Sequence, residues 1–180
     1  MDPIIFAAVT LSLAVATVID LRSQRIPNLL TIPAALAAVA YHLLSQGPQG
    51  AWFSLAGLGL GLSLMLAPFL FGVMGGGDVK LLAAVGAWVG PQTVLVAFLL
   101  TSLAGGGYAL VLLARRSGLL RGVFTRLRAA LYAASATGEF HYQPASQGFA
   151  LPKLCYGLAI ALGSLAAMTR SVLVAGWLAG

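Results

Sequence analysis

Long apolar stretches alternate with short polar segments along the chain. A helix that crosses a bilayer needs about 20 mostly apolar residues, or somewhat fewer where the bilayer thins or the helix ends reach the interface. Six stretches meet or approach this length: 4–19, 29–44, 52–73, 81–89, 94–114 and 154–175. The pattern predicts an all-α integral membrane protein with six transmembrane helices, of which the fourth is short.

The composition agrees with this prediction and limits the chemistry. The chain is 60% hydrophobic and 8% charged, whereas about a quarter of the residues in an ordinary soluble domain are charged. Most of its ten basic residues fall in two clusters, 22–25 and 115–128, which is typical of loops beside a bilayer and not of a nucleic-acid-binding face. The single cysteine, Cys155, excludes an intrachain disulfide, and the separated His42 and His141 do not suggest a metal site. We therefore predict no metal, no cofactor and no nucleic-acid partner.

The short stretch 81–89 decides the topology. It has only about ten residues before a Gly-Pro pair at 90–91, so as a helix it would cover roughly 15 Å of a ~30 Å bilayer core. Positively charged loops face the cytoplasm, and 115–128 joins Arg22 and Arg25 on that side only if 81–89 crosses. The N-terminus is then outside, and the tryptophans are expected at the outer interface: Trp52, Trp88 and Trp177.

Polar residues interrupt the apolar pattern at 74–82, which reads MGGGDVKLL. A crossing by so few residues requires the helix to begin below the cytoplasmic surface, which places Asp78 at depth in the membrane. We expect Gly75 and Gly77 to give the backbone freedom to bend there and to leave space beside the carboxylate. Asp78 as a helix cap is the alternative interpretation, but an ionisable residue inside a membrane favours a functional role.

Asp20 is the expected partner of Asp78. Asp2 lies at the terminus and Glu139 in a polar loop, whereas Asp20 ends the first apolar stretch on the same side as Asp78. Two carboxylates that lie close together can share one proton, so one can activate water as a base while the other protonates a leaving amine. A surface carboxylate screened by Arg22 is the alternative for Asp20.

Two other functional classes remain open on these residues. A small ion-coupled transporter would use the two acids as a proton or cation site. It predicts acids near the bilayer midplane and broken helices in two repeats, whereas the sequence shows one break and no clear repeat. A non-catalytic scaffold for membrane assembly is the third possibility.

The acids lie in motifs that resemble those of the type IV prepilin peptidase family, a group of GxGD intramembrane aspartyl proteases. GGGD at 75–78 looks like the GxGD signature, and DLR at 20–22 with IPN at 26–28 resembles the family's first-aspartate motif. Residues 151–163 look like the family's last helix. The resemblance extends from residue 4 to about residue 163.

The resemblance implies an endopeptidase of the bacterial inner membrane that cleaves the leader of single-span prepilins on the cytoplasmic side. It implies that Asp20 and Asp78 are the catalytic pair. Further motif residues would support the site or set the topology: Gly75, Gly77, Lys80, Arg22, Arg25, Pro27 and Asn28. Longer members carry a tetracysteine zinc-binding insert and methylate the new N-terminus. Because this chain lacks the cysteine pairs, it is more similar to the short peptidases of tight-adherence (Flp) pilus systems, and methyltransferase activity is not expected.

The rest of the chain is expected to complete one membrane-embedded peptidase domain, 1–180. Residues 115–150 predict a cytoplasmic loop, and the helical period of apolar residues in 119–131 predicts an amphipathic segment on the cytoplasmic leaflet, or else a plain connector. Gly57 and Gly61, four residues apart, predict close helix contacts. Whether the chain forms a homo-oligomer in the bilayer stays open.

Overall fold

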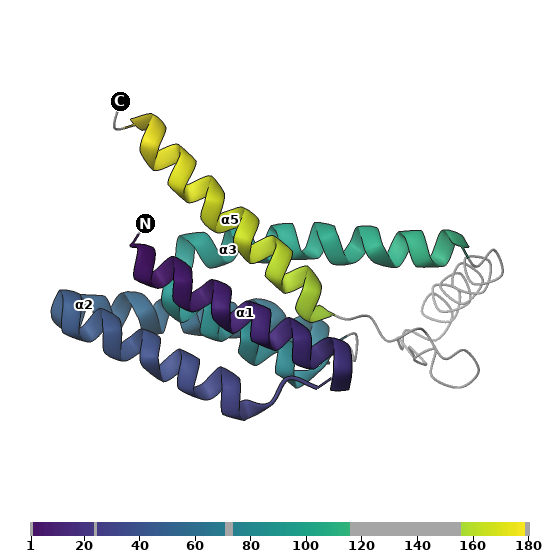
Figure 1. The fold of residues 1–180 in the computed structure, drawn as a ribbon, viewed down its shortest axis with the longest axis horizontal. Helices are drawn as coiled ribbons and strands as arrows, with labels where there is room; N and C mark the ends of the chain where they lie inside the picture. The colour runs from purple at the N-terminus through teal and green to yellow at the C-terminus, as the bar shows by residue number, and fades with distance from the viewer. Residues whose placement is uncertain (1, 24, 71–73, 116–155, 179–180) are drawn as a thin grey trace, which may run out of the picture. The chain divides into compact units, whose positions relative to one another are not determined.

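Every secondary-structure element in the described part of the chain is an α-helix. The computed structural model describes residues 2–23, 25–70, 74–115 and 156–178. Figure 1 shows the helices in chain order: α1 (Pro3–Ser23), α2 (Asn28–Leu70), α3 (Gly76–Arg115) and α5 (Tyr156–Leu178). The all-α prediction is confirmed for these residues. The predicted amphipathic segment 119–131 and nearly all of the loop 115–150 lie outside them.

Two glycines divide the longest helices into shorter segments. Gly47 in α2 has φ 67° and ψ −153°, and Gly90 in α3 has φ 78° and ψ 175°. Glycine adopts such positive φ values without the steric penalty of a side chain. A proline follows each glycine, Pro48 and Pro91, and proline suits the first turn of the helix that begins there. The described residues therefore contain six helical segments, close to the six predicted stretches.

Three of the described helices are long and apolar enough to cross a membrane: Pro3–Ser23, Asn28–Leu70 and Gly76–Tyr108. If straight, the 43 residues of α2 would extend about 65 Å, roughly twice the ~30 Å bilayer core. The length of α2 is thus enough for two crossings, and the break at Gly47 allows the chain to turn back between them. A membrane protein is supported, whereas six crossings, the crossing of α5 and the orientation stay predictions.

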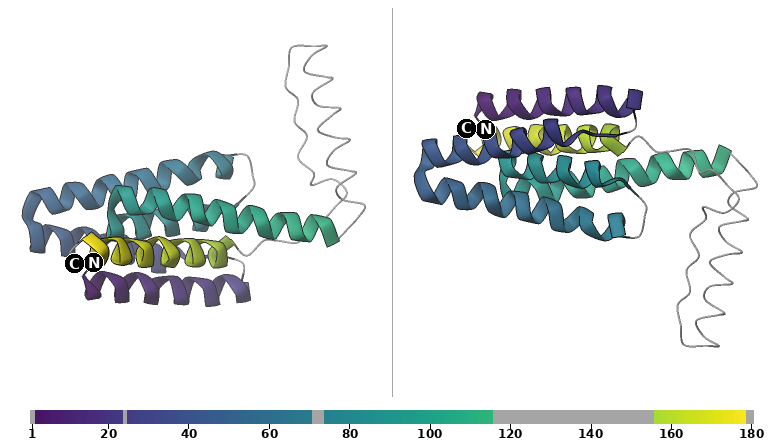
Figure 2. Two further views of the ribbon diagram at one scale, coloured as in Figure 1. Left: turned by 90° about the horizontal axis from the view of Figure 1, so that it is seen from above. Right: turned by 90° about the horizontal axis from the view of Figure 1, so that it is seen from below.

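The first segment of α3 forms the centre of the bundle. Residues 81–90 are all buried, and α1 lies against α5 and contacts α2 beside it (Figures 1 and 2). Because protein surrounds this segment, it needs no lipid-facing side. The enclosure by protein explains why the sequence between Lys80 and Gly90 is short and apolar throughout.

Backbone contact joins the second segment of α2 to the first segment of α3. A Cβ atom on Gly57 would lie 2.0 Å from the carbonyl oxygen of Gly86, and one on Gly61 would lie 2.7 Å from that of Leu82. The Ser54 hydroxyl also donates a hydrogen bond of 2.8 Å to the Ala87 carbonyl oxygen. The close helix contacts predicted from the spacing of Gly57 and Gly61 are therefore confirmed.

The side chain of Trp88 does not face the bilayer as an aromatic belt would, and its level in the membrane stays a prediction. Its side chain is 7% exposed, because the α3 segment that carries it is enclosed on all sides. The ring packs against Tyr41, and its carbonyl oxygen lies 3.0 Å from Nε2 of the buried His42. Trp52 is 73% exposed, whereas the side chain of Trp177 lies outside the described part of the structure.

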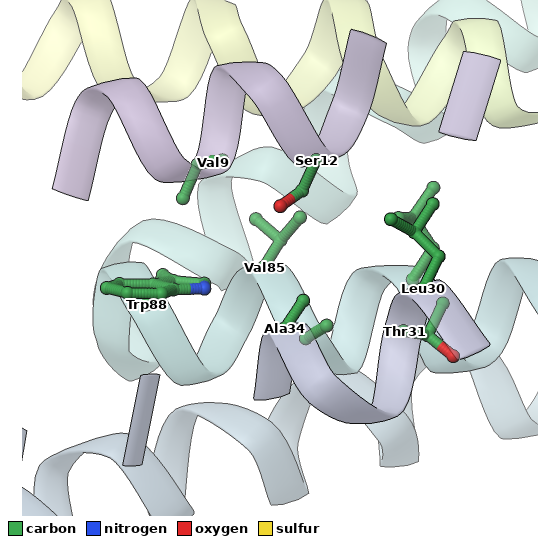
Figure 3. A pocket seen from close by; sticks show the side chains of 9 residues that line it. Val9, Ser12, Leu30, Thr31, Ala34, Val85 and Trp88 are labelled. Carbon is green, nitrogen blue, oxygen red and sulfur yellow. The ribbon is translucent and has the colours of Figure 1, made fainter. Parts of the chain in front are cut away.

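A small cavity of about 10 Å³ lies between α1, α2 and α3. Figure 3 shows Val9 and Ser12 of α1, Thr31 of α2, and Val85 and Trp88 of α3 around it. Its volume is about that of one water probe, so it is too small for a ligand. A larger open groove of about 350 Å³ is lined by α2 and α3. Neither acid of the predicted pair lines either space.

The chain divides into two compact units, 1–105 with 155–180 and 106–154. The second unit lies largely outside the described residues. One peptidase domain over 1–180 therefore stays a prediction.

Replacing Gly57 by Ala should destabilise the bundle, because the new methyl group would overlap the carbonyl oxygen of Gly86. Overpacking of this kind costs about 1–3 kcal/mol of unfolding free energy. Gly59→Ala is the matched control, since no atom lies within 4 Å of its Cβ position. Thermal unfolding in detergent should show a lower midpoint for Gly57→Ala only. Equal midpoints would contradict the backbone contact.

Candidate active site

Asp78 lies in the first turn of α3 and caps that helix. Its backbone N–H donates to the Gly75 carbonyl oxygen at 3.1 Å, and its Oδ2 atom accepts a hydrogen bond from the Gly75 N–H at 3.1 Å. The residue is 9% exposed. The first N–H groups of a helix have no acceptors within the helix, and its N-terminus carries partial positive charge. The hydrogen bond from Gly75 therefore fixes this buried carboxylate at the start of its own helix, as the capping interpretation expects.

Asp20 lies near the end of α1 and caps a different helix. Its Oδ2 atom accepts a hydrogen bond of 3.1 Å from the N–H of Gly157, the second residue of α5. Asp20 is 7% exposed, which argues against the alternative interpretation of it as a surface carboxylate. Only glycine permits this approach, because a Cβ atom on residue 157 would lie 2.9 Å from Oδ2 of Asp20.

The two carboxylates make the same kind of contact. They are close enough for the charge of Asp20 to act on Asp78, and each accepts a hydrogen bond at the N-terminus of a helix through its Oδ2 atom. Among the described residues, neither Oδ1 atom has a hydrogen-bond partner. The backbone thus binds one oxygen of each carboxylate, and no residue that the structure describes bonds the other.

Gly77 brings the two sequence motifs together. A Cβ atom on Gly77 would lie 2.9 Å from Cβ and 3.1 Å from the carbonyl oxygen of Ile26. The first turn of α3 therefore lies directly against the segment between α1 and α2. The Lys80 ammonium group donates a hydrogen bond of 2.8 Å to Oδ1 of Asn28, which adds a second link between the motifs.

Pro27 directly precedes α2. Its carbonyl oxygen accepts a hydrogen bond of 3.1 Å from the N–H of Leu30, in the first turn of α2. The neighbouring Ile26 is 8% exposed and packs under Gly77. This turn holds the segment after α1 in a defined position, as expected from the proline.

The expected backbone role of Gly75 and Gly77 differs from the structure. Among the described glycines, positive φ occurs at Gly47 and Gly90, so Gly75 and Gly77 are not needed for their backbone angles. A Cβ on Gly75 would lie 3.5 Å from Oδ2 of Asp78, and one on Gly76 would lie 3.5 Å from the Phe69 ring. Both are ordinary contacts. Close packing therefore explains Gly77, whereas Gly75 leaves room beside the carboxylate.

The two arginines of the first motif do not contact the acids. Arg22 and Arg25 are exposed, and in the part of the chain that the structure describes neither forms an ion pair. Their predicted role in setting the topology is compatible with this exposure. Gly157 is the site residue that we did not single out from the sequence. The sequence feature that could have indicated it is a glycine near the start of the last apolar stretch.

The described residues also contain no cluster of three or more His, Cys, Asp or Glu side chains that could hold a metal ion. The two acids are the only buried carboxylates among these residues. The arrangement supports acid–base chemistry by a carboxylate pair.

Comparison with known proteins identifies similar chains. The model of the type IV leader peptidase family matches residues 7–110, a range that includes both acids. The prepilin leader peptidase/N-methyltransferase of Escherichia coli K12 is 37% identical over 109 residues, which cover 56% of this chain and 48% of that protein. Leader peptidase HopD of Salmonella typhimurium is 36% identical over 104 residues, 53% of this chain and 66% of that protein.

A third relative is the prepilin leader peptidase/N-methyltransferase of Aeromonas hydrophila, which is 36% identical over 114 residues, 56% of this chain and 38% of that protein. The matches thus span between about a third and two thirds of the relatives' own lengths. No solved structure matches the chain at a significant level.

The carboxylates should stabilise the fold as helix caps, independently of any chemistry. Asn and Ala both remove the charge of Asp20 or Asp78, but Asn keeps a carbonyl oxygen that can accept the backbone N–H. Loss of a cap costs about 1 kcal/mol. In thermal unfolding, each Ala variant should therefore melt below the Asn variant at the same position. Equal midpoints would show that the hydrogen bonds to Gly75 and Gly157 contribute no stability.

Proposed function

The chain belongs to the type IV leader peptidase family, and on that premise we propose that it is an intramembrane aspartyl endopeptidase. The observation that carries the proposal is the pair Asp20 and Asp78: two buried carboxylates at two helix N-termini, each with one free oxygen. Carboxylates that share a site can share one proton. One then acts as a general base while the other acts as a general acid.

The proposed reaction is hydrolysis of one peptide bond. The base carboxylate takes a proton from water, and the water oxygen bonds to the scissile carbonyl carbon. The tetrahedral intermediate then collapses, the C–N bond breaks, and the protonated carboxyl group gives its proton to the leaving amine. No covalent bond forms between the enzyme and the substrate.

The backbone hydrogen bonds support this chemistry by preorganisation. Because Gly75 and Gly157 each hold one carboxylate oxygen, the acids need little reorientation when substrate arrives. Positioning of this kind supplies a large part of the rate in enzymes. The buried surroundings also strengthen electrostatic interactions in the site.

The proposed substrates are single-span prepilins of type IV-like systems, whose leader is removed on the cytoplasmic side of the inner membrane. Exposed basic residues support this side, because Arg22 lies in the last turn of α1, Arg25 follows that helix, and Lys80 lies two residues after Asp78. A substrate that is itself a membrane helix must unwind around its cleavage site to reach the acids. The similarity to short peptidases of tight-adherence pili suggests such pilins as candidates. The proposal does not include methyltransferase activity.

A transporter is less well supported than a peptidase. It predicts acids near the bilayer midplane and broken helices in two repeats. In the structure, Asp78 instead lies at the start of α3, and Asp20 lies in the last turn of α1. The helix breaks at Gly47 and Gly90 carry no acid.

Replacing Asp20 or Asp78 by Asn should abolish cleavage while the protein stays inserted and folded. Removal of a general acid or base lowers rates about 10²–10⁴-fold. Asp2→Asn is the matched control, because Asp2 is an exposed acid that bonds Tyr41 instead of facing the site. Each variant is co-expressed with a candidate prepilin, and mass spectrometry then identifies the N-terminus of the product. Normal processing by Asp20→Asn or Asp78→Asn would disprove the assignment of the pair.

Gly77→Ala should lose most activity, and Gly76→Ala should lose little. The new methyl group on Gly77 would meet Ile26 at 2.9 Å and move the first turn of α3, whereas that on Gly76 would make an ordinary contact with Phe69. A displacement of about 1 Å at reacting groups costs on the order of a hundredfold in rate. The same prepilin assay at matched protein levels measures both variants. Similar activity of the two would mean that the contact with Ile26 does not position Asp78.

A further inference from the structure

Tyr156 precedes the glycine that binds Asp20, and the proposed chemistry so far gives it no role. It is the first residue of α5 and directly precedes Gly157, whose N–H holds Asp20. The charge of Asp78 acts on the Tyr156 phenol. The side chain is partly buried, so part of its surface remains accessible.

Gly105 provides the surface on which the Tyr156 ring rests. A Cβ atom on Gly105 would lie 3.1 Å from Cε1 and 3.5 Å from the hydroxyl oxygen of Tyr156. The ring is therefore held between the second segment of α3 and the start of α5. This packing restricts the direction of the phenol, and it needs only the ring, not the hydroxyl group.

The Tyr156 hydroxyl has no hydrogen-bond partner in the described part of the chain. A phenol donates one hydrogen bond and accepts others, and tyrosine hydroxyls in partly apolar surroundings usually have a partner. A phenol donor that has no partner among the described residues, one position before the glycine that binds Asp20, has the chemistry to bind an oxygen of the substrate.

We propose that Tyr156 is a third catalytic residue, which donates a hydrogen bond to the carbonyl oxygen of the scissile peptide bond. This inference rests on the proposed peptidase function. As water adds to the carbonyl carbon, negative charge develops on that oxygen, and the phenol stabilises it. The phenol keeps its proton throughout, and the carboxylate pair alone transfers protons between water and the leaving amine. A donor aimed at developing charge favours the transition state over the bound substrate.

Tyr156→Phe tests the proposal directly, because it removes the hydroxyl and keeps the ring on Gly105. Tyr41→Phe is the matched control, since that hydroxyl bonds Asp2 at the opposite end of α1. The assay uses the full-length protein in detergent and a synthetic prepilin peptide that contains the leader and the following apolar segment. We expect kcat to fall at least about tenfold, toward the hundredfold or more that one lost oxyanion donor costs, with KM nearly unchanged. Tyr41→Phe should keep wild-type kcat.

A transition-state mimic gives a second measurement. In this peptide a hydroxyethylene group replaces the scissile amide, so that it resembles the tetrahedral intermediate. Tyr156→Phe should weaken binding of the mimic by about the same factor as it lowers kcat/KM, and it should leave binding of the cleaved product unchanged.

The outcomes separate this inference from the proposed function. Wild-type kcat in Tyr156→Phe, or a raised KM at unchanged kcat, would overturn the role of Tyr156 while the peptidase assignment stands. Equal loss in Tyr41→Phe would also overturn it, because the effect would then not be specific to the site. A wild-type protein that cleaves no prepilin, or Asp78→Asn that cleaves normally, would overturn the proposed function and this inference with it.

Discussion

The N–H groups at the start of a helix need acceptors, because the helix itself supplies none. This constraint organises the candidate site. The N–H of Gly75 donates to Asp78 at the start of α3, and the N–H of Gly157 donates to Asp20 at the start of α5. Each carboxylate satisfies a backbone group that would otherwise cost free energy, and each helix end offers partial positive charge to a buried anion. Capping and acid–base function are thus compatible, because capping uses one oxygen of each carboxylate and leaves the other free.

Glycine allows the backbone to come close enough for these contacts to form. Gly157 admits Asp20 to the start of α5, and Gly77 admits Ile26 to the start of α3. Further along α3, Gly86 meets Gly57 of α2, and the two helices pack there backbone against backbone. Without a strong hydrophobic effect between helices in lipid, close packing and hydrogen bonds hold such a bundle together. A methyl group at any of these positions would separate elements that the site requires to touch.

The enclosed first segment of α3 connects the fold to the proposed chemistry. Residues 81–90 are buried on every side, so this segment is fixed by its neighbours and carries Asp78 at its start. Tyr156 approaches from α5 and rests on Gly105 of the second α3 segment. The two acids and the phenol therefore come from three helices, and their relative positions depend on packing across the whole bundle.

Local patterns in the sequence were sufficient to predict the helical segments, the breaks near Gly47 and Gly90, and Asp20 and Asp78 as the acids of interest. Helices and helix breaks depend mainly on residues that are close in the sequence. Apolar runs, Gly-Pro pairs and isolated charges are patterns of such residues, so the sequence is enough to recognise them. Only the tertiary structure placed Gly157 against Asp20, because that hydrogen bond joins residues 137 positions apart. It also decided that Trp88 is buried, and that Gly77 is needed for its contact with Ile26 and not for its backbone angle. Burial and close approach depend on which helices become neighbours, and no pattern within a single helix records that choice.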